Sequence, residues 1–283
     1  MADNQDFTFI GTAAFAGPGQ SDWFSNGTDK FLFLKAGRDR YDYRLNKSED
    51  FMNLNLPAGK LIDISLPLDA RTFHMRTYSG FKKDMQFDVE VIKEYEDGGY
   101  GQIVRGAHMR LHAGTHVDAP SHMLKGAPDL QDVPLRAYFG DAIIADVRHR
   151  GGGEAITPAD LEKAVGDIIL PGDRLLLRTD QNQDYDGSPE WMKRAPYVNV
   201  AATDWCVEKR ISLIGFDFYH GATGPDEDEY PERTKGYARA GIITMPYICN
   251  LDQISKRRVT LMAFPLNMIG VEASPVRAIV MEY

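Results

Sequence analysis

Short apolar runs separated by turn-forming residues dominate the chain from residue 60 onward. Most runs are rich in Val, Ile and Leu and are bounded by Gly, Pro, Asn or Asp, which is the pattern of β-strands. Several are apolar on both faces, as expected of strands that are covered on both sides of a sheet. The predicted strands are 61–66, 88–95, 102–111, 141–147, 173–179, 211–218, 259–264 and 277–283.

The segment TPADLEKAVGDI, residues 157–168, has the signals of a helix. Thr157 suits the N-cap, Pro158 suits the first helical position, and Asp160 is placed to complete a capping box. We therefore predict a helix that begins directly after Thr157.

Two further segments complete the pattern. VAATDWCVEKR, residues 200–210, is predicted to be a helix that packs Trp205 and Val207 on the sheet. Residues 221–240 have no apolar period and are heavily charged, so we expect a long loop there. Loops of this length inside compact domains are often lids or binding loops.

The order of these elements predicts an α+β fold, with a mostly β core and flanking helices, over residues 59–283. Residues 1–58 differ, because they are rich in Gly, Asn, Asp and aromatic residues and lack a sustained period. We expect them to form an N-terminal extension or arm that packs its aromatic side chains on the main body or on a second subunit. A short helix or hairpin within this arm remains open.

Composition narrows the classes of partner. The 283 residues carry a formal net charge of −9, which offers no electrostatic footprint for nucleic acid or an anionic membrane and favours a small-molecule substrate. No apolar run reaches the roughly 18 residues of a membrane span, and the first residues do not resemble a signal peptide. Cys206 and Cys249 are far apart and form no disulfide framework. A cytoplasmic protein is therefore expected.

The stretch LHAGTHVDAPSHM, residues 111–123, concentrates three of the seven histidines of the chain beside an aspartate. On a straight strand His112 and His116 would lie about 13 Å apart, too far to share one ion. A bend at Gly114 would bring His112, His116 and Asp118 around a common point. The pattern thus predicts a loop-borne metal site, with a set of hydrogen-bonded polar residues at a turn as the alternative.

Two imidazoles and one carboxylate suit a single Zn²⁺ or Mn²⁺ with an open coordination position. A water at that position becomes a hydroxide nucleophile near neutral pH, and the metal can polarise a carbonyl group. Both roles indicate hydrolysis.

The same stretch, HAGTHVDAPSH, resembles the H-x-G-T-H-x-D-x-P-x-H signature of the cyclase-like metal-dependent hydrolases. This family includes bacterial kynurenine formamidase, isatin hydrolase and a trans-dienelactone hydrolase. Other segments are similar in the same order, namely 61–68, 175–180, 213–218, 249–254 and 265–279. The resemblance covers residue 60 to the C-terminus and implies a swivelling β/β/α fold that is usually a homodimer.

The resemblance also implies functional roles. It places the metal ligands at His112, His116 and Asp118, and makes His122 a second-metal ligand or an active-site acid or base. Family members with two metals use a further glutamate, whose position here is taken by Pro246, which favours a single metal.

Two histidines are candidates for the catalytic base that this glutamate would have supplied. His122 comes first, because it lies beside the metal ligands, and His220, which follows a predicted strand, comes second. A surface position is the alternative for His220. His108 is expected to be a structural neighbour rather than a ligand.

The leading hypothesis is a metal-dependent hydrolase that cleaves a carbon–nitrogen bond of a small cyclic amide or N-acyl substrate through a metal-bound hydroxide. The choice of amide rests on the resemblance, and a lactone or ester substrate is the close alternative. A non-hydrolytic cyclase or dehydratase of secondary metabolism, and a metal-stabilised binding protein without a base, are the other hypotheses.

Overall fold

The computed structural model describes residues 22–25, 30–36, 40–44, 59–68, 87–96, 101–186, 188–222 and 229–283. The chain divides into two compact units, Met1–Leu56 and Pro57–Tyr283. In the first unit, strands β1 (Asp22–Ser25), β2 (Lys30–Ala36) and β3 (Arg40–Arg44) form an antiparallel sheet in that order. The packing of the N-terminal arm that the sequence suggested lies outside the described residues.

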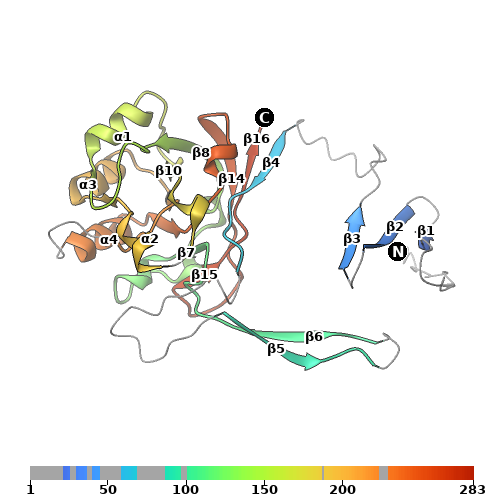
Figure 1. The fold of residues 1–283 in the computed structure, drawn as a ribbon. Coiled ribbons are helices and arrows are strands. Elements are labelled where there is room, and N and C mark those ends of the chain that lie inside the picture. The colour runs from blue at the N-terminus through green and yellow to red at the C-terminus, as the bar shows by residue number, and fades with distance from the viewer. Residues whose placement is uncertain are drawn as a thin grey trace, which may run out of the picture. The chain divides into compact units, whose positions relative to one another are not determined.

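The second unit is built on a nine-stranded mixed sheet (Figure 1). Strands β8, β10, β12 and β13 run parallel to one another in its centre, and antiparallel strands extend both edges. In sheet order the strands are β15 (Ala273–Pro275), β7 (His116–Asp118), β13 (Ile243–Pro246), β12 (Leu213–Phe216), β10 (Arg174–Arg178), β8 (Phe139–Asp146), β14 (Arg258–Met262), β16 (Ile279–Glu282) and β4 (Lys60–Asp63).

The central strands are apolar on both faces because each face is covered. Along β8, Ile143 and Ala145 belong to one core cluster, whereas Ala142 and Ile144 belong to a second cluster on the opposite face. This alternation follows from the period of two along a strand. The prediction of strands covered on both sides is confirmed for this part of the sheet.

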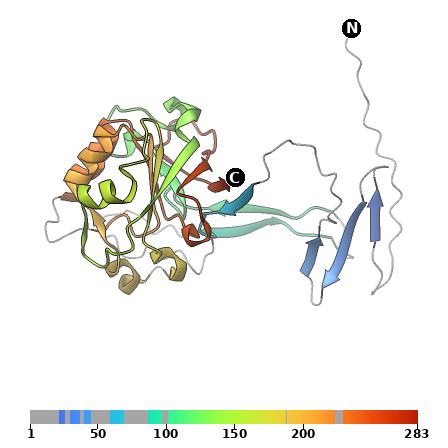
Figure 2. The ribbon, with the colours of Figure 1, turned by 90° about the horizontal axis from the view of Figure 1, so that it is seen from above.

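Helices flank the sheet, and α1, α3 and α4 gather at one face (Figures 1 and 2). Four α-helices lie in the described residues, together with five short 3-10 helices and the small parallel pair β9 (Ala155–Ile156) and β11 (Tyr197–Val198). The α-helices are α1 (Pro158–Val165), α2 (Pro189–Lys193), α3 (Val200–Glu208) and α4 (Glu229–Arg239). The 3-10 helices are Pro120–His122, Leu130–Asp132, Leu135–Ala137, Gln181–Asp184 and Leu251–Gln253.

The predicted α+β class and the predicted helix start at Thr157 are confirmed. The Thr157 side chain accepts a hydrogen bond from the Asp160 amide, and the Asp160 carboxylate accepts one from the Thr157 amide at 2.8 Å. In α3, Trp205 is buried as predicted, but Val207 is exposed, so its predicted packing on the sheet was wrong. Residues two apart on a helix point to different sides.

The loop expected over residues 221–240 is contradicted, because α4 occupies Glu229–Arg239. Its buried face consists of Arg233, Thr234, Tyr237 and Ala238, which have helical spacing. The buried guanidinium of Arg233 donates to the carbonyls of Val198 and His220 at 2.9 and 3.0 Å. Because the buried face of this helix includes a charged residue, the sequence shows no apolar period there, and the hydrophobic pattern did not predict the helix. Residues 223–228, of which 226–228 are acidic, lie outside the described part.

Each predicted strand overlaps an observed one, including the separate antiparallel hairpin of β5 (Asp88–Lys93) and β6 (Val104–His108). Strands β7, β13 and β15 were not predicted, because two of them are only three residues long and are defined by partners far away in the sequence. Among the described helices, none is long and apolar enough to cross a membrane.

Candidate metal centre and active site

The site begins at the bend that the sequence predicted. Gly114 has a φ of +57°, and the buried strand β7 begins two residues later, at His116. Thr115 holds the bend by donating its hydroxyl to the Tyr247 carbonyl at 2.5 Å and by accepting from the Leu66 amide at 2.8 Å. Left-handed backbone favours glycine, which explains the residue at this position.

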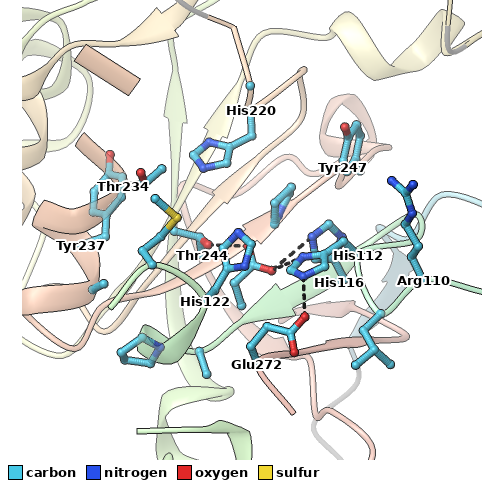
Figure 3. A pocket seen from close by; sticks show the side chains of 18 of the residues that line it. Arg110, His112, His116, His122, His220, Thr234, Tyr237, Thr244, Tyr247 and Glu272 are labelled. Carbon is cyan, nitrogen blue, oxygen red and sulfur yellow. Dashed lines mark hydrogen bonds and ion pairs between the residues drawn. The ribbon is translucent and has the colours of Figure 1, made fainter. Parts of the chain in front are cut away.

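The bend brings His112 and His116 (Figure 3) together with Asp118. Oδ1 of Asp118 lies 2.8 Å from Nδ1 of His112 and 3.3 Å from Nε2 of His116. His116 and Asp118 are buried, and about a quarter of the His112 side chain is exposed. Asp118 and Thr244 are register partners on β7 and β13, and Oδ2 accepts from the Thr244 hydroxyl at 2.8 Å.

One nitrogen of each histidine ring faces an oxygen outside the cluster. His116 contacts the Gly114 carbonyl through Nδ1 at 2.8 Å, and His112 contacts the Glu272 carboxylate through Nε2 at 3.0 Å. Carbonyl and carboxylate oxygens only accept, so these two nitrogens are the donors. The other two nitrogens, Nε2 of His116 and Nδ1 of His112, both face Oδ1 of Asp118. With a divalent ion bound, each of these nitrogens would be deprotonated and would present its lone pair to the ion.

Two imidazole nitrogens and one carboxylate oxygen thus converge on one point. Oδ1 of Asp118 is buried and has no hydrogen-bond partner despite its two close nitrogens. Buried acceptors of this kind need a cation, and two imidazoles with one carboxylate are the ligands that Zn²⁺ and Mn²⁺ take. The chemistry of the donor set fits a divalent metal.

His122 lies at the open side of this cluster. It ends the 3-10 helix Pro120–His122, and its ring centroid is 4.4 Å from that of His112. Within the described residues, the one group of three or more potential ligands that converges is His112, Asp118 and His122, whose ligand atoms lie within 4.8 Å of one another. His122 is therefore placed either to bind the metal or to act beside it.

Burial and charge act in opposite directions on these groups. Burial would raise the pKa of Asp118, but His116 and His112 hold it well below its usual value. Burial would lower the pKa of His112, but Asp118 and Glu272 raise it. For His122, burial lowers the pKa and outweighs the attraction of Asp118.

His220 also lines the site. It follows β12, its ring stacks on Phe216 with centroids 4.2 Å apart, and it projects toward the cavity (Figure 3). Burial, assisted by the charge of Arg233, lowers the pKa of His220 to about 3. At neutral pH this side chain is an uncharged imidazole.

The cluster forms one wall of a cavity of about 670 Å³. The remaining walls are mostly apolar and come from Leu111, Met123, Tyr237, Ile242 and Tyr247, with Arg110 as a further cationic group. A mostly apolar cavity with a few convergent polar groups is the usual form of a small-molecule site.

The structure brings all five predicted site residues to this cavity: His112, His116, Asp118, His122 and His220. Pro246 also lines it and offers no ligand atom. His108 lies on the hairpin β5–β6, where its Nε2 is 3.1 Å from Oε1 of Glu90, and it is not among the residues that line the cavity.

Sequence reasoning missed Glu272 and Thr244. No local spacing marks them, because they are 160 and 126 residues away from their partners His112 and Asp118. The one available signal for Glu272 was its place in the segment 265–279 that carries part of the family resemblance.

The mixed sheet, in which the short strand β7 carries the bent His–Asp motif to the wall of an apolar cavity, defines the class of this protein. Residues 62–220 match the profile of the putative cyclase family. The chain belongs to this family. The predicted resemblance is confirmed.

Curated relatives and solved structures agree with this assignment. Kynurenine formamidase of Bacillus cereus is 30% identical over 226 residues, which cover 80% of this chain and 99% of the relative. Kynurenine formamidase of Bacillus mycoides is also 30% identical over the same share of each chain. The predicted enzyme class, a hydrolase of C–N bonds other than peptide bonds, is that of these relatives.

Two solved structures share the fold. Isatin hydrolase A from Labrenzia aggregata, solved with benzyl benzoate, superposes with a TM-score of 0.70 at 23% identity, covering 81% of this chain and 96% of that one. A predicted metal-dependent hydrolase from Bacillus stearothermophilus has a TM-score of 0.63 at 24% identity, covering 80% and 100%.

Proposed function

We propose that this protein is a metal-dependent hydrolase that cleaves the C–N bond of a small cyclic amide or N-acyl substrate. One Mn²⁺ or Zn²⁺ would be held by His112, His116 and Asp118. The observation that carries this proposal is the convergence of two imidazole nitrogens and one buried carboxylate oxygen at the wall of a substrate-sized cavity.

A divalent metal bound there supplies an activated water and polarises the substrate carbonyl. Asp118 and the two ligand histidines are held in place by Thr244, Gly114 and Glu272.

Proton transfer and substrate orientation are assigned to the two remaining histidines of the cavity, His122 and His220. His122 stands beside the ligand cluster at the open side, where its ring is within reach of a leaving nitrogen. His220, a neutral imidazole in the cavity wall, serves as a hydrogen-bonding group that orients the substrate.

The preference for an amide draws on the relatives. The matched curated proteins are named for formamide hydrolysis and one structural neighbour for isatin hydrolysis. The apolar walls suit a flat aromatic substrate. A lactone would use the same groups, since only the leaving atom changes.

The test is turnover of N-formyl arylamines, cyclic imides and lactones by purified protein, with and without chelation. We expect turnover of an amide that is lost with chelator and restored by Mn²⁺ or Zn²⁺. Activity that persists in metal-free protein would refute the metal-dependent reaction. Hydrolysis in H₂¹⁸O incorporates the label into the acid product, whereas ring closure by dehydration does not.

We further propose that the protein is a homodimer. The hairpin β5–β6 exposes Val89 and Val91 on one face, and all six residues of β5 are exposed. An isolated two-stranded hairpin is marginally stable in water, so a second copy of the chain that covers this face would stabilise it. Cys206 and Cys249 are both free and buried, which supports a reducing, cytoplasmic setting.

A further inference from the structure

We propose that Glu272 is a positioning residue of the metal centre, which holds His112 in the tautomer and orientation that bind the ion. This inference rests on the proposed function and adds to it a residue outside the predicted ligand set. Three observations support it: the contact between Glu272 and His112, the pairing of β15 with β7 that fixes this contact, and the charges of Glu272 and Asp118.

The contact is specific to one nitrogen of His112. Oε1 of Glu272 lies 3.0 Å from Nε2, while Nδ1 of the same ring lies 2.8 Å from Asp118 Oδ1. When the ion is bound, the carboxylate would accept from Nε2–H and so keep the lone pair on Nδ1, which faces the other ligand atoms. Carboxylate–histidine–metal arrangements of this kind raise the basicity of the ligand and fix its ring.

The position of Glu272 is fixed by the strand that carries the ligands. Its carbonyl accepts from the Ala119 amide at 2.8 Å, and β15 continues from Ala273 in antiparallel register with β7. Ala273 pairs with Asp118 and Pro275 pairs with His116. The pairing of β15 with β7 therefore places the Glu272 side chain at the metal cluster by backbone geometry (Figure 3).

Each of the three proposed ligands is held by a group that is not itself a proposed ligand, and Glu272 differs from the other two holding groups in its charge. His116 is held by the Gly114 carbonyl and Asp118 by the Thr244 hydroxyl, both of which are neutral. Glu272 is the charged partner, and its side chain is 41% exposed in the cavity wall. Together with Asp118 it supplies two negative charges, which a divalent ion balances.

Two other roles are open to a carboxylate at this place. It could bind a second metal ion itself, in place of the family glutamate whose position is taken here by Pro246. It could also take a proton from the substrate. The contact between Glu272 and His112 favours positioning, because Oε1 is already engaged with Nε2, the nitrogen of the ligand histidine that faces away from Asp118.

The test measures Zn²⁺ affinity by chelator competition, with Zn²⁺ content per chain, for wild type, Glu272→Ala and Glu272→Gln. We expect the alanine variant to bind one Zn²⁺ about 10- to 100-fold more weakly. The glutamine variant should lose less, because its amide oxygen still accepts from Nε2–H. Glu208→Gln, an exposed carboxylate on α3, is the matched control and should bind like wild type.

A spectroscopic measurement separates positioning from general destabilisation. In the ¹⁵N spectrum of histidine-labelled, Zn²⁺-loaded protein, His112 should show a protonated Nε2 in wild type and in Glu272→Gln, and an altered Nε2 signal in Glu272→Ala. The glutamine variant keeps the test available if the alanine variant does not fold.

Three results would overturn the inference. Unchanged Zn²⁺ affinity in Glu272→Ala would remove the positioning role, even if turnover fell. A drop from two Zn²⁺ per chain to one would make Glu272 a ligand instead. Absence of Zn²⁺ binding by wild type would refute the proposed function itself, and this inference with it.

Discussion

Gly114 lies directly against Leu68: a Cβ added to the glycine would come within 2.6 Å of Leu68 Cδ2. The glycine also has a φ of +57°, which L-residues adopt at a cost of about 1–2 kcal/mol. We predict that Gly114→Ala destabilises the fold by about 2 kcal/mol or more and weakens metal binding, because His112 and His116 flank the bend. Thermal unfolding and metal content measure the two effects.

Gly153→Ala is the control for backbone strain alone. Gly153 has a φ of +73°, and no atom lies within 4 Å of an added Cβ. This variant should lose stability and keep its metal. Equal metal loss in both variants would contradict a special role for the bend.

His116→Ala should abolish stoichiometric metal binding. His116 is buried and presents Nε2 to Asp118, so its removal takes away one of three proposed ligand atoms. Elemental analysis of protein purified without a metal-affinity tag should give about one Mn or Zn per chain in wild type. His108→Ala, on the exposed hairpin, should retain the metal, and retention by both variants would disprove the assigned ligand set.

Replacement of His220 should lower turnover without removing a limb of the pH profile. Burial lowers the pKa of His220 to about 3, so the side chain stays neutral from pH 5 to 9. We expect His220→Gln to reduce kcat/KM about tenfold or more, as for loss of a positioned hydrogen-bonding group. The measurement is kcat/KM across this range. Loss of a limb with a midpoint between pH 5 and 8 would show that His220 titrates during catalysis.

Asp160 should make stability sensitive to acid. Burial would raise the pKa of this carboxyl, but hydrogen bonds from Thr157, His149 and Arg150 hold it well below its usual value. The ionised form is therefore favoured by folding, and the stabilisation present above about pH 4 is lost as the pH falls toward the folded-state pKa. Asp160→Asn should cost about 1–3 kcal/mol at pH 7.

Urea unfolding at pH 7, 5 and 3.5 measures this dependence. The difference between wild type and Asp160→Asn should shrink at the lowest pH. Asp204→Asn, an exposed aspartate on α3, should match wild type throughout. A constant difference at every pH would mean that the Asp160 charge does not contribute.

Val91→Lys should dissociate the proposed dimer. Val91 is 51% exposed on the apolar face of the hairpin, and a buried lysine at an interface carries a desolvation cost. Light scattering should show wild type as a dimer and the variant as a monomer at low micromolar concentration. Ile269→Lys is the control: Ile269 is 84% exposed and lies outside the hairpin, so this variant should have the same mass in solution as wild type. A wild-type monomer would refute the dimer.

Local patterns of residues in the sequence were sufficient to predict much of the fold. The strands of the buried sheet were predicted because β8 and β10 repeat apolar residues on both faces. The start of α1 was predicted because its cap lies within four residues. Helix α4 was missed because part of its inward face is a buried arginine, whose hydrogen bonds to distant carbonyls replace the apolar contacts that a pattern search detects.

The sequence by itself determined the candidate ligands, because His112, His116, Asp118 and His122 lie within eleven positions around one glycine. Only the tertiary structure decided how these side chains are oriented. Thr244 on β13 and Glu272, directly before β15, reach them because both strands pair with β7, across 126 and 160 residues of chain. Strand pairing depends on which edges meet in three dimensions, and no local period records that choice.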